Sequence, residues 1–233
     1  LKNRKMLVAA VVFALVSLSH AKWVIRNGNG DDMLEVVNQD NGVRLFTDSG
    51  SGADQDLSVF EPSDMPGFWR TGHCATNGYP LAMPCTLPMV MDISGLGPID
   101  INRPLATPTG VDPTPIWDDK GSGSDQDYAF WRLQCPTGFV ALSDFGTASY
   151  AYPSFLTSRA RCVNIQLVHQ CSIGAKIWDV SGSGSDRDGS IWRVANGQNS
   201  ARFDQHFVVA AGYNPPSRTP WCFRAIVEVP DDE

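Results

Sequence analysis

Three Asp-x-Asp pairs are the residues of this sequence whose type and spacing best suit ligand chemistry. The pairs are Asp54 and Asp56, Asp125 and Asp127, and Asp186 and Asp188. Alternating carboxylates with carbonyls and hydroxyls beside them offer the oxygen ligands that Ca²⁺ takes in proteins. The pairs therefore predict ligand-binding loops, with calcium as the candidate ion at Asp125, Asp127, Asp186 and Asp188. Asp48, Asp119 and Asp179 could each add a ligand from the end of the preceding strand.

The same carboxylates also have a structural interpretation. Each pair follows a Gly-Ser-Gly run, at residues 50–52, 121–123 and 182–184. In such a turn an Asp side chain accepts backbone N–H bonds and fixes the loop. The EF-hand spacing, with its bidentate Glu, is absent from the sequence. We therefore expect structural loops, with Asp127 and its counterparts as caps, and no cofactor other than calcium.

Other chemistry has weaker support in the sequence. Carbohydrate sites pair carboxylates and amides with exposed aromatic rings, and four tyrosines near Pro-rich loops suit that role: Tyr79, Tyr150, Tyr152 and Tyr213. Beyond residue 21 the histidines are His73, His169 and His206, which share no common position in the repeat described below. The sequence has no Gly-x-Ser-x-Gly elbow, His-Glu-x-x-His motif or phosphate loop. We therefore expect a protein that is not an enzyme.

The Asp pairs belong to a pattern that occurs three times. The spacing between Asp54, Asp125 and Asp186 is 71 and 61 residues. An aromatic residue precedes and another follows each glycine loop: Phe46 and Phe60, Trp117 and Trp131, Trp178 and Trp192. A pattern that recurs at nearly constant period indicates an internally repeated fold. Because aromatic and β-branched residues flank the loops, each copy predicts a strand, a polar loop and a strand, with the aromatic residues in the core.

The whole chain is expected to be all-β. No apolar pattern of helical period persists, and the 16 prolines are spread along the chain. The repeats span about 22–93, 115–168 and 171–229, and a Pro-rich connection covers 94–114. The runs 33–37 and 43–46 flank a turn sequence and predict a hairpin. Three β-sheet repeats in a pseudo-threefold arrangement, like a β-prism, would bury the shared aromatic residues, and a three-lobed barrel or trefoil is the alternative.

The first 21 residues predict a signal peptide followed by a single domain, 22–233. Lys2, Arg4 and Lys5 precede an apolar run that ends in small residues at 19–21. That run is too short to span a membrane, so no transmembrane segment is expected. The mature chain would hold 15 Lys and Arg against 25 Asp and Glu. This acidic balance argues against nucleic acid as a partner.

Six cysteines in a secreted chain predict three disulfides, which 15 connectivities could supply. The repeat narrows the choice, since each copy contains two cysteines. One bridge within each repeat is the simplest arrangement: Cys74 with Cys85, Cys135 with Cys162, and Cys171 with Cys222.

Residues 116–132, followed by 136–144, resemble a known signature. It is that of the vacuolar protein sorting-associated protein 62 family, and it is similar to the adaptor-binding repeats of vacuolar-sorting lipid-transfer proteins. The resemblance implies a β-rich, non-catalytic module. In the family pattern the second Asp of the loop, here Asp127 and Asp188, is the regular one. The signal segment, the paired cysteines and the acidic balance distinguish this chain from a cytosolic sorting protein.

These features together predict a secreted binding protein that recognises glycans or a cell surface. One alternative is a structural or interaction protein of an extracellular matrix or coat. A second is a membrane-acting toxin component, for which such a module would supply the targeting. The sequence does not indicate an oligomeric state.

Overall fold

The computed structural model describes residues 22–154, 156–195 and 205–230, so the predicted signal segment lies outside the described residues. This part of the chain is strand and loop, apart from the four-residue helix α1 (Leu156–Arg159) and the 3-10 turn η1 (Ile165–Leu167). The all-β prediction is thereby confirmed. Among the described helices, none has the length and apolar character needed to cross a membrane.

Three sheets share one pattern, in which a hairpin is followed by a third antiparallel strand. The first joins β3 (Gly42–Thr47), β4 (Leu57–Pro62) and β6 (Cys74–Asn77). The second joins β10 (Trp117–Asp118), β11 (Ala129–Trp131) and β14 (Phe145–Thr147). The third joins β17 (Ser172–Asp179), β18 (Ser190–Ala195) and β19 (Phe207–Ala210). The glycine loop connects the two hairpin strands each time, as predicted.

The register of these sheets defines which residues are equivalent. Phe60 pairs with Cys74, Trp131 with Phe145, and Trp192 with Val208. The middle strand of each sheet therefore presents its aromatic residue to the same position of the third strand. Equivalence by strand register agrees with equivalence by sequence repeat, which allows contacts in the three copies to be compared one by one.

The remaining strands form four further antiparallel sheets. The largest has the order β21 (Ile226–Val229), β1 (Lys22–Arg26), β2 (Asp32–Gln39), β7 (Leu87–Asp92) and β5 (Trp69–Arg70). Two short sheets pair β12 (Leu133–Gln134) with β9 (Gly110–Val111), and β16 (Val168–Gln170) with β20 (Trp221–Phe223). The last has the order β13 (Phe139–Val140), β15 (Cys162–Asn164) and β8 (Leu105–Ala106). None of these described sheets closes into a barrel, so the barrel alternative is not observed.

One predicted hairpin is wrong. The run 33–37 lies in β2, which pairs with β1 and β7, whereas the run 43–46 lies in β3, which pairs with β4. The chain thus passes from one sheet to another at the turn that was expected to close a hairpin. The predicted Pro-rich connection, 94–114, is not purely irregular, because β8 and β9 lie within it.

Aromatic residues from all three repeats meet in one hydrophobic cluster. Trp117 and Trp178 are fully buried, and their rings lie 5.5 Å apart, edge to face. Phe46 stacks on Tyr128 at 4.6 Å. Since a large buried aromatic residue contributes much of a core's burial energy, this cluster is expected to hold the repeats together. Trp131 is also buried, as predicted, but Trp192 is only half-buried.

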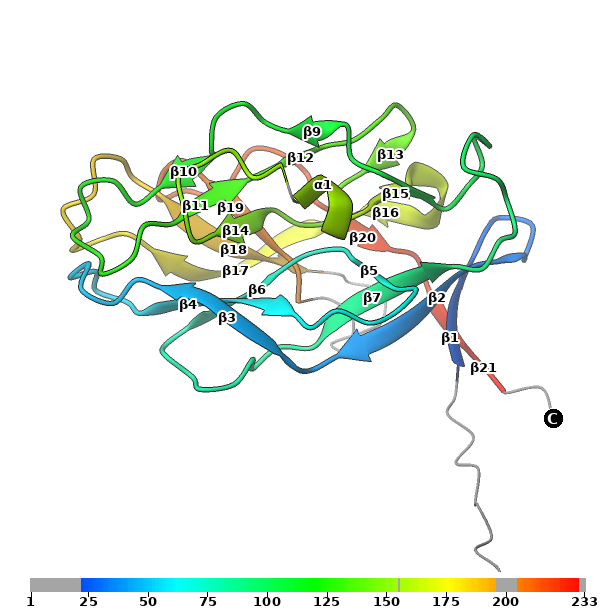
Figure 1. Ribbon diagram of the computed structural model, residues 1–233, viewed down its shortest axis with the longest axis horizontal. Coiled ribbons are helices and arrows are strands. Elements are labelled where there is room, and N and C mark those ends of the chain that lie inside the picture. Colours follow the sequence, from blue (N-terminus) through cyan, green and yellow to red (C-terminus); the bar gives the residue numbers. More distant parts are fainter. Residues whose placement is uncertain (1–21, 155, 196–204, 231–233) are drawn as a thin grey trace, which may run out of the picture.

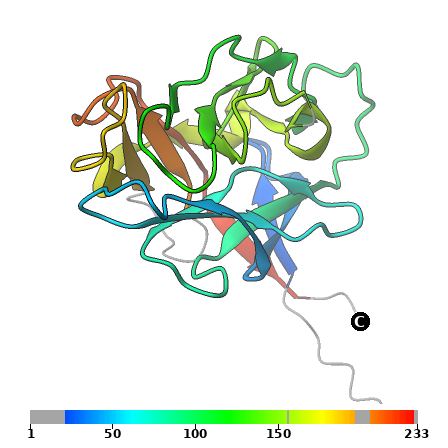
Figure 2. The same cartoon turned by 60° about the vertical axis from the view of Figure 1, so that its left-hand side comes forward.

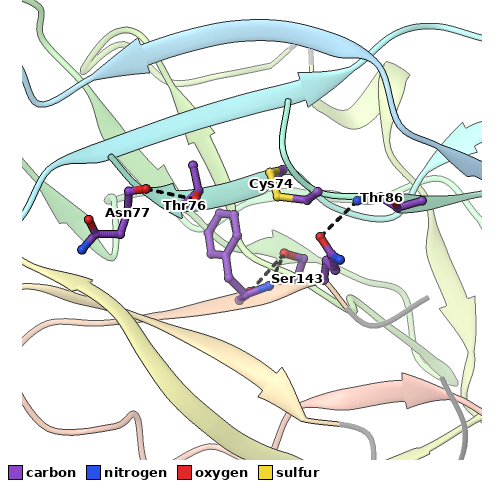
Figure 3. The surroundings of a disulfide bond; sticks show 8 residues. Cys74, Thr76, Asn77, Thr86 and Ser143 are labelled. Carbon is purple, nitrogen blue, oxygen red and sulfur yellow. Dashed lines mark hydrogen bonds between the residues drawn. A yellow bond between two sulfur atoms is a disulfide. The ribbon is translucent and has the colours of Figure 1, made fainter. Parts of the chain in front are cut away.

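The three predicted disulfides are confirmed: Cys74–Cys85, Cys135–Cys162 and Cys171–Cys222. All six cysteines are paired. Around the first bridge the repeats are in contact, as Figure 3 shows. The backbone N–H of Thr86 donates to Oε1 of Gln205, and Oγ of Ser143 donates to the carbonyl of Phe207. Segments far apart in sequence are therefore bonded beside the Cys74 bridge.

Candidate functional site

The three glycine loops lie together at one end of the molecule. Residues 49–56, 120–127 and 181–188 join β3 to β4, β10 to β11, and β17 to β18, and all three turns lie at the left of Figure 1. Strands β1 and β21 lie toward the opposite side, and the turned view in Figure 2 shows the same grouping of loops. We call these three loops the loop end.

Each loop is bonded to the next in a closed cycle. The backbone N–H of the first Asp donates to a carbonyl of a neighbouring loop: Asp125 to Ser49 at 2.7 Å, Asp186 to Lys120 at 2.8 Å, and Asp54 to Ser181 at 2.7 Å. In addition, Ser49 Oγ donates to Oδ2 of Asp125 at 2.8 Å. The first Asp of each pair is therefore a contact between repeats. The sequence did not predict this role.

Glycine is required where these contacts are made. Gly50 has a φ of +83°, and a Cβ atom there would lie 2.7 Å from Oδ1 of Asp125. Gly182 has a φ of +86°, and its Cβ would lie 2.6 Å from Oδ1 of Asp54. Only glycine adopts such a backbone readily while leaving room for a carboxylate. The recurrence of Gly-Ser-Gly is thus explained by close packing of one loop on another.

Two buried tryptophan side chains also donate hydrogen bonds to backbone carbonyls of neighbouring loops. Nε1 of Trp117 donates to the carbonyl of Arg187 at 2.8 Å, and Nε1 of Trp178 donates to the carbonyl of Gln55 at 2.8 Å. Phe46 occupies the equivalent position in the first repeat and packs on Tyr128 instead. Buried indole N–H groups need such partners, so the loops are held by the core beneath them.

The backbone of two loops is capped by the strand-end aspartates. Oδ1 of Asp48 accepts from the N–H of Leu57 at 2.7 Å, and Oδ1 of Asp119 accepts from the N–H of Tyr128 at 2.9 Å. Both carboxylates are almost fully buried. Burial raises the pKa of Asp48 above its ordinary value. The capping role that was expected for Asp127 therefore belongs to Asp119, eight residues earlier.

Asp179 is not the third member of that set. By strand register Asp179 is equivalent to Thr47 and Asp118, so Val180 is equivalent to Asp48 and Asp119. The N–H of each of these three residues donates to the equivalent carbonyl across the hairpin, that of Leu57, Tyr128 or Gly189. Asp179 lies one position earlier and contacts Nζ of Lys176 and the N–H of Ser181. Burial acts to raise the pKa of Asp179, but these bonds outweigh it and hold the pKa below its ordinary value. The third loop thus lacks the buried capping carboxylate.

The second Asp of each pair lies beside a tyrosine. Tyr79 is close to Asp56, Tyr150 to Asp127, and Tyr213 to Asp188. Oη of Tyr79 also donates to Oδ1 of Asp48 at 2.8 Å. Burial, followed by hydrogen bonds to the aspartates, raises the pKa of Tyr79 and that of Tyr150. The loop end therefore presents the same tyrosine–carboxylate pair three times.

The sequence holds a signal for this pairing that was missed. The tyrosine follows the second Asp by 23, 23 and 25 residues in the three repeats. Tyr152, the fourth tyrosine predicted for a sugar site, is not part of this set and contacts β9 instead.

A calcium site is not assembled from the predicted aspartates alone. In the described ranges, no three His, Cys, Asp or Glu side chains are grouped so that they could hold a metal ion together. The first Asp of each loop faces a neighbouring loop, and the second faces a tyrosine. Calcium at Asp125, Asp127, Asp186 and Asp188 stays a prediction.

The chain is similar to one protein family and to a solved structure. The family described as vacuolar protein sorting-associated protein 62 matches residues 21–212, which confirms the resemblance seen in the sequence. Among solved structures, the crystal structure of GNIP1Aa from Chromobacterium piscinae is similar, with a TM-score of 0.66 and 28% identity. The similar region covers 81% of this chain and 36% of that one, so this chain corresponds to about a third of the larger protein. No curated protein matches the chain.

Proposed function

This chain belongs to the vacuolar protein sorting-associated protein 62 family, and from that premise we propose that it is a secreted, non-catalytic binding protein. It folds as a β-prism of three repeats and recognises glycans of a cell surface through the loop end. The three disulfides fit an extracellular protein, since such bridges persist in oxidising compartments. The predicted signal peptide at 1–21 would direct the chain there.

The repeated tyrosine–carboxylate pair carries this proposal. The side chains of Asp56, Asp127 and Asp188 are exposed, and Tyr79 and Tyr213 are 43% and 41% exposed. Carboxylates accept hydrogen bonds from sugar hydroxyls, while an aromatic ring packs against the apolar face of a sugar. Three equivalent pairs on one surface would bind a branched or clustered glycan with higher avidity than any single pair.

The non-catalytic part of the proposal has separate support. His73 and His206 are buried where repeats meet, and burial lowers their pKa values to about 3 and 4. Neither histidine is placed to exchange protons with a ligand at the loop end. A general acid or base would need a pKa near the working pH.

A glycan array tests the proposal directly. The refolded, disulfide-bonded chain should bind a defined subset of glycans, and Asp127→Asn should weaken binding at least tenfold. Asp40→Asn, at an exposed aspartate outside the loops, is the charge-matched control and should bind like the parent. A blank array would reject glycan recognition. Leakage of dye from liposomes would then favour a membrane-acting toxin component, and self-assembly without any ligand would favour a matrix or coat protein.

A further inference from the structure

Two cavities lie at equivalent positions between neighbouring repeats. One, of about 530 Å³, lies between the first and second repeats, and its lining includes Leu45, Glu61 and Gly146. The other, of about 410 Å³, lies between the second and third, and its lining includes the equivalent residues Ile116, Arg132 and Val209. The fold thus forms a cavity of the size of a small-molecule pocket at each of these junctions. Their polar side chains differ, so their ligands should differ as well.

His73 places an unused hydrogen-bond donor at the first cavity. The side chain is 1% exposed, and its Nδ1 accepts from the backbone N–H of Gly146 at 3.3 Å. Because Nδ1 is an acceptor, the proton of the neutral ring lies on Nε2. Burial, with the nearby charge of Arg70, lowers the pKa of His73 to about 3 and keeps the ring neutral. Nε2 has no hydrogen-bond partner within the described residues, which is costly for a buried polar group.

Glu61 places an acceptor beside that donor. Oε2 of Glu61 lies 3.9 Å from Nε2 of His73, which is too far for a direct hydrogen bond. This gap suits a hydroxyl group, which can accept from Nε2 and donate to Oε2 at the same time. A carboxylate ligand cannot donate to Glu61, and an ammonium ligand cannot accept from His73.

The charges around Glu61 are already balanced. Its carboxylate contacts Nη1 of Arg70 at 2.5 Å and Nη1 of Arg159 at 3.0 Å, and Arg70 also donates to Asp64 at 2.7 Å. Two guanidinium groups therefore face two carboxylates. A charged ligand would find no unpaired counter-charge there, so the cavity favours a neutral molecule.

The rest of the lining is largely apolar. Leu45, Ala148, Ala151 and Tyr152 contribute to it. Tyr152 is 51% exposed, and its Oη is engaged by β9, accepting from the N–H of Val111 at 3.2 Å. With its hydroxyl held in this way, the tyrosine offers the cavity a fixed aromatic ring. A half-exposed ring beside a donor–acceptor pair suits a molecule with one apolar face and a hydroxyl edge.

We propose that this cavity binds one neutral pyranose residue, with a ring hydroxyl shared between Nε2 of His73 and Glu61 and with the C–H face of the sugar against Tyr152. The site is additional to the loop end and does not depend on what the loops recognise. It would add a monosaccharide pocket between the first two repeats.

Titration with single sugars tests the pocket. The probes are the methyl glycosides of glucose, galactose, mannose and N-acetylglucosamine, with glucuronate and glucosamine as charged counterparts. We expect at least one neutral glycoside to bind and to shift the Nε2–H resonance of His73 in an NMR spectrum of ¹⁵N-histidine-labelled protein. Tyr152→Ala should weaken that binding at least tenfold. Ile165→Ala, which removes an apolar side chain of similar exposure outside both the cavity and the loop end, is the matched control and should leave it unchanged.

Several outcomes would overturn the pocket. They are the absence of any response at His73, binding that survives Tyr152→Ala, and binding of glucuronate or glucosamine alone. Because the His73 signal is read in the unsubstituted protein, no result depends on whether a His73 variant folds. The two sites fail separately. Asp127→Asn should weaken array binding at least tenfold without affecting the glycoside titration, and a blank array would not alter the response at His73.

Discussion

The backbone N–H of Gly146 donates a hydrogen bond to Nδ1 of His73, which joins the second repeat to the first at 3.3 Å. The next junction has the same bond with a different acceptor, because the N–H of Val209 donates to Oδ2 of Asp144 at 2.8 Å. By strand register His73 is equivalent to Asp144, and Gly146 to Val209. At both junctions a side-chain acceptor of one repeat thus bonds to the third strand of the next repeat. The acceptor is a buried neutral histidine at the first junction and a buried aspartate at the second.

The buried histidines should make the protein sensitive to mild acid. Burial lowers the pKa of His73 to about 3 and that of His206 to about 4, whereas both groups titrate near 6.5 when unfolded. Below that pH the unfolded chain binds protons that the folded chain does not, so the free energy of unfolding falls as the pH falls. Between pH 7 and pH 5 each histidine should lower it by about 2 kcal/mol.

Urea denaturation at pH 7, 6 and 5 measures this dependence. The two histidines together should lower the free energy of unfolding between pH 7 and pH 5. His73→Asn should remove about half of that decrease, and His206→Asn should remove the other half. The comparison uses the pH slope of each variant, so a uniform loss of stability on substitution does not affect it. An unchanged slope in both variants would show that the two rings bind protons equally in the folded and unfolded states, so that burial does not lower their pKa values.

Calcium should not stabilise the protein measurably. A ligand that binds only the folded state raises the melting temperature. The carboxylates of Asp54, Asp125 and Asp186, however, lie against the glycines of neighbouring loops, and those of Asp56, Asp127 and Asp188 lie beside tyrosines. We expect the same melting temperature in millimolar CaCl₂ and in EDTA. An increase of several degrees in calcium, lost in Asp127→Asn but kept in Asp40→Asn, would establish a metal site at the loops instead.

Much of the fold could be predicted from local patterns in the sequence. The glycine loops with flanking aromatic residues identified the three hairpins, and one cysteine pair per repeat identified the three disulfides. Both signals are local, because each is complete within one repeat. The hairpin expected at 33–46 was wrong because a turn sequence fixes a reversal of the chain but not the sheet that the next strand joins.

The site depends on contacts between repeats, which no local pattern contains. The first Asp of each loop looked like a cation ligand but bonds to the adjacent loop. Asp179 was grouped with Asp48 and Asp119 by residue type, yet strand register gives that position to Val180. His73 belongs to no recognisable sequence motif. Its function as a hydrogen-bond acceptor between repeats follows from its contact with Gly146 of β14, which only the structure shows.

Trp178→Phe should destabilise the protein through lost contacts between repeats. Nε1 of Trp178 donates both to the carbonyl of Gln55 at 2.8 Å and to Oδ2 of Asp48 at 2.9 Å. Phenylalanine keeps an aromatic ring, as Phe46 does in the first repeat, but leaves the buried carboxylate of Asp48 and the partly buried carbonyl of Gln55 without this donor. The expected loss is about 1–3 kcal/mol. Trp192→Phe is the control, since that half-buried indole donates to Ser190 of its own strand and, within the described residues, does not bond to another repeat.

The two variants can be compared by chemical denaturation. A loss for Trp178→Phe no greater than that for Trp192→Phe would mean that the indole bond does not hold the first loop to the third repeat. Measuring Trp178→Phe in an Asp48→Asn background separates the carboxylate contact from the carbonyl contact, because contacting groups give non-additive energies.

Gly50→Ala should cost more than Gly52→Ala, although both glycines lie in one loop with positive φ. The left-handed backbone, at +83° and +72°, makes each substitution unfavourable by about 1–2 kcal/mol. At Gly52 the nearest atom to a new Cβ is the carbonyl oxygen of Gly182 at 3.8 Å, whereas at Gly50 it is Oδ1 of Asp125 at 2.7 Å. The carboxylate of Asp125 must then move away and lose its bond from Ser49, which should add about 1 kcal/mol. In an Asp125→Ala background the carboxylate is gone, although the backbone nitrogen of residue 125 stays 3.2 Å from the new Cβ, so the difference between the two glycine substitutions should shrink. A difference as large there as in the parent protein would show that the carboxylate of Asp125 is not what makes Gly50→Ala more costly.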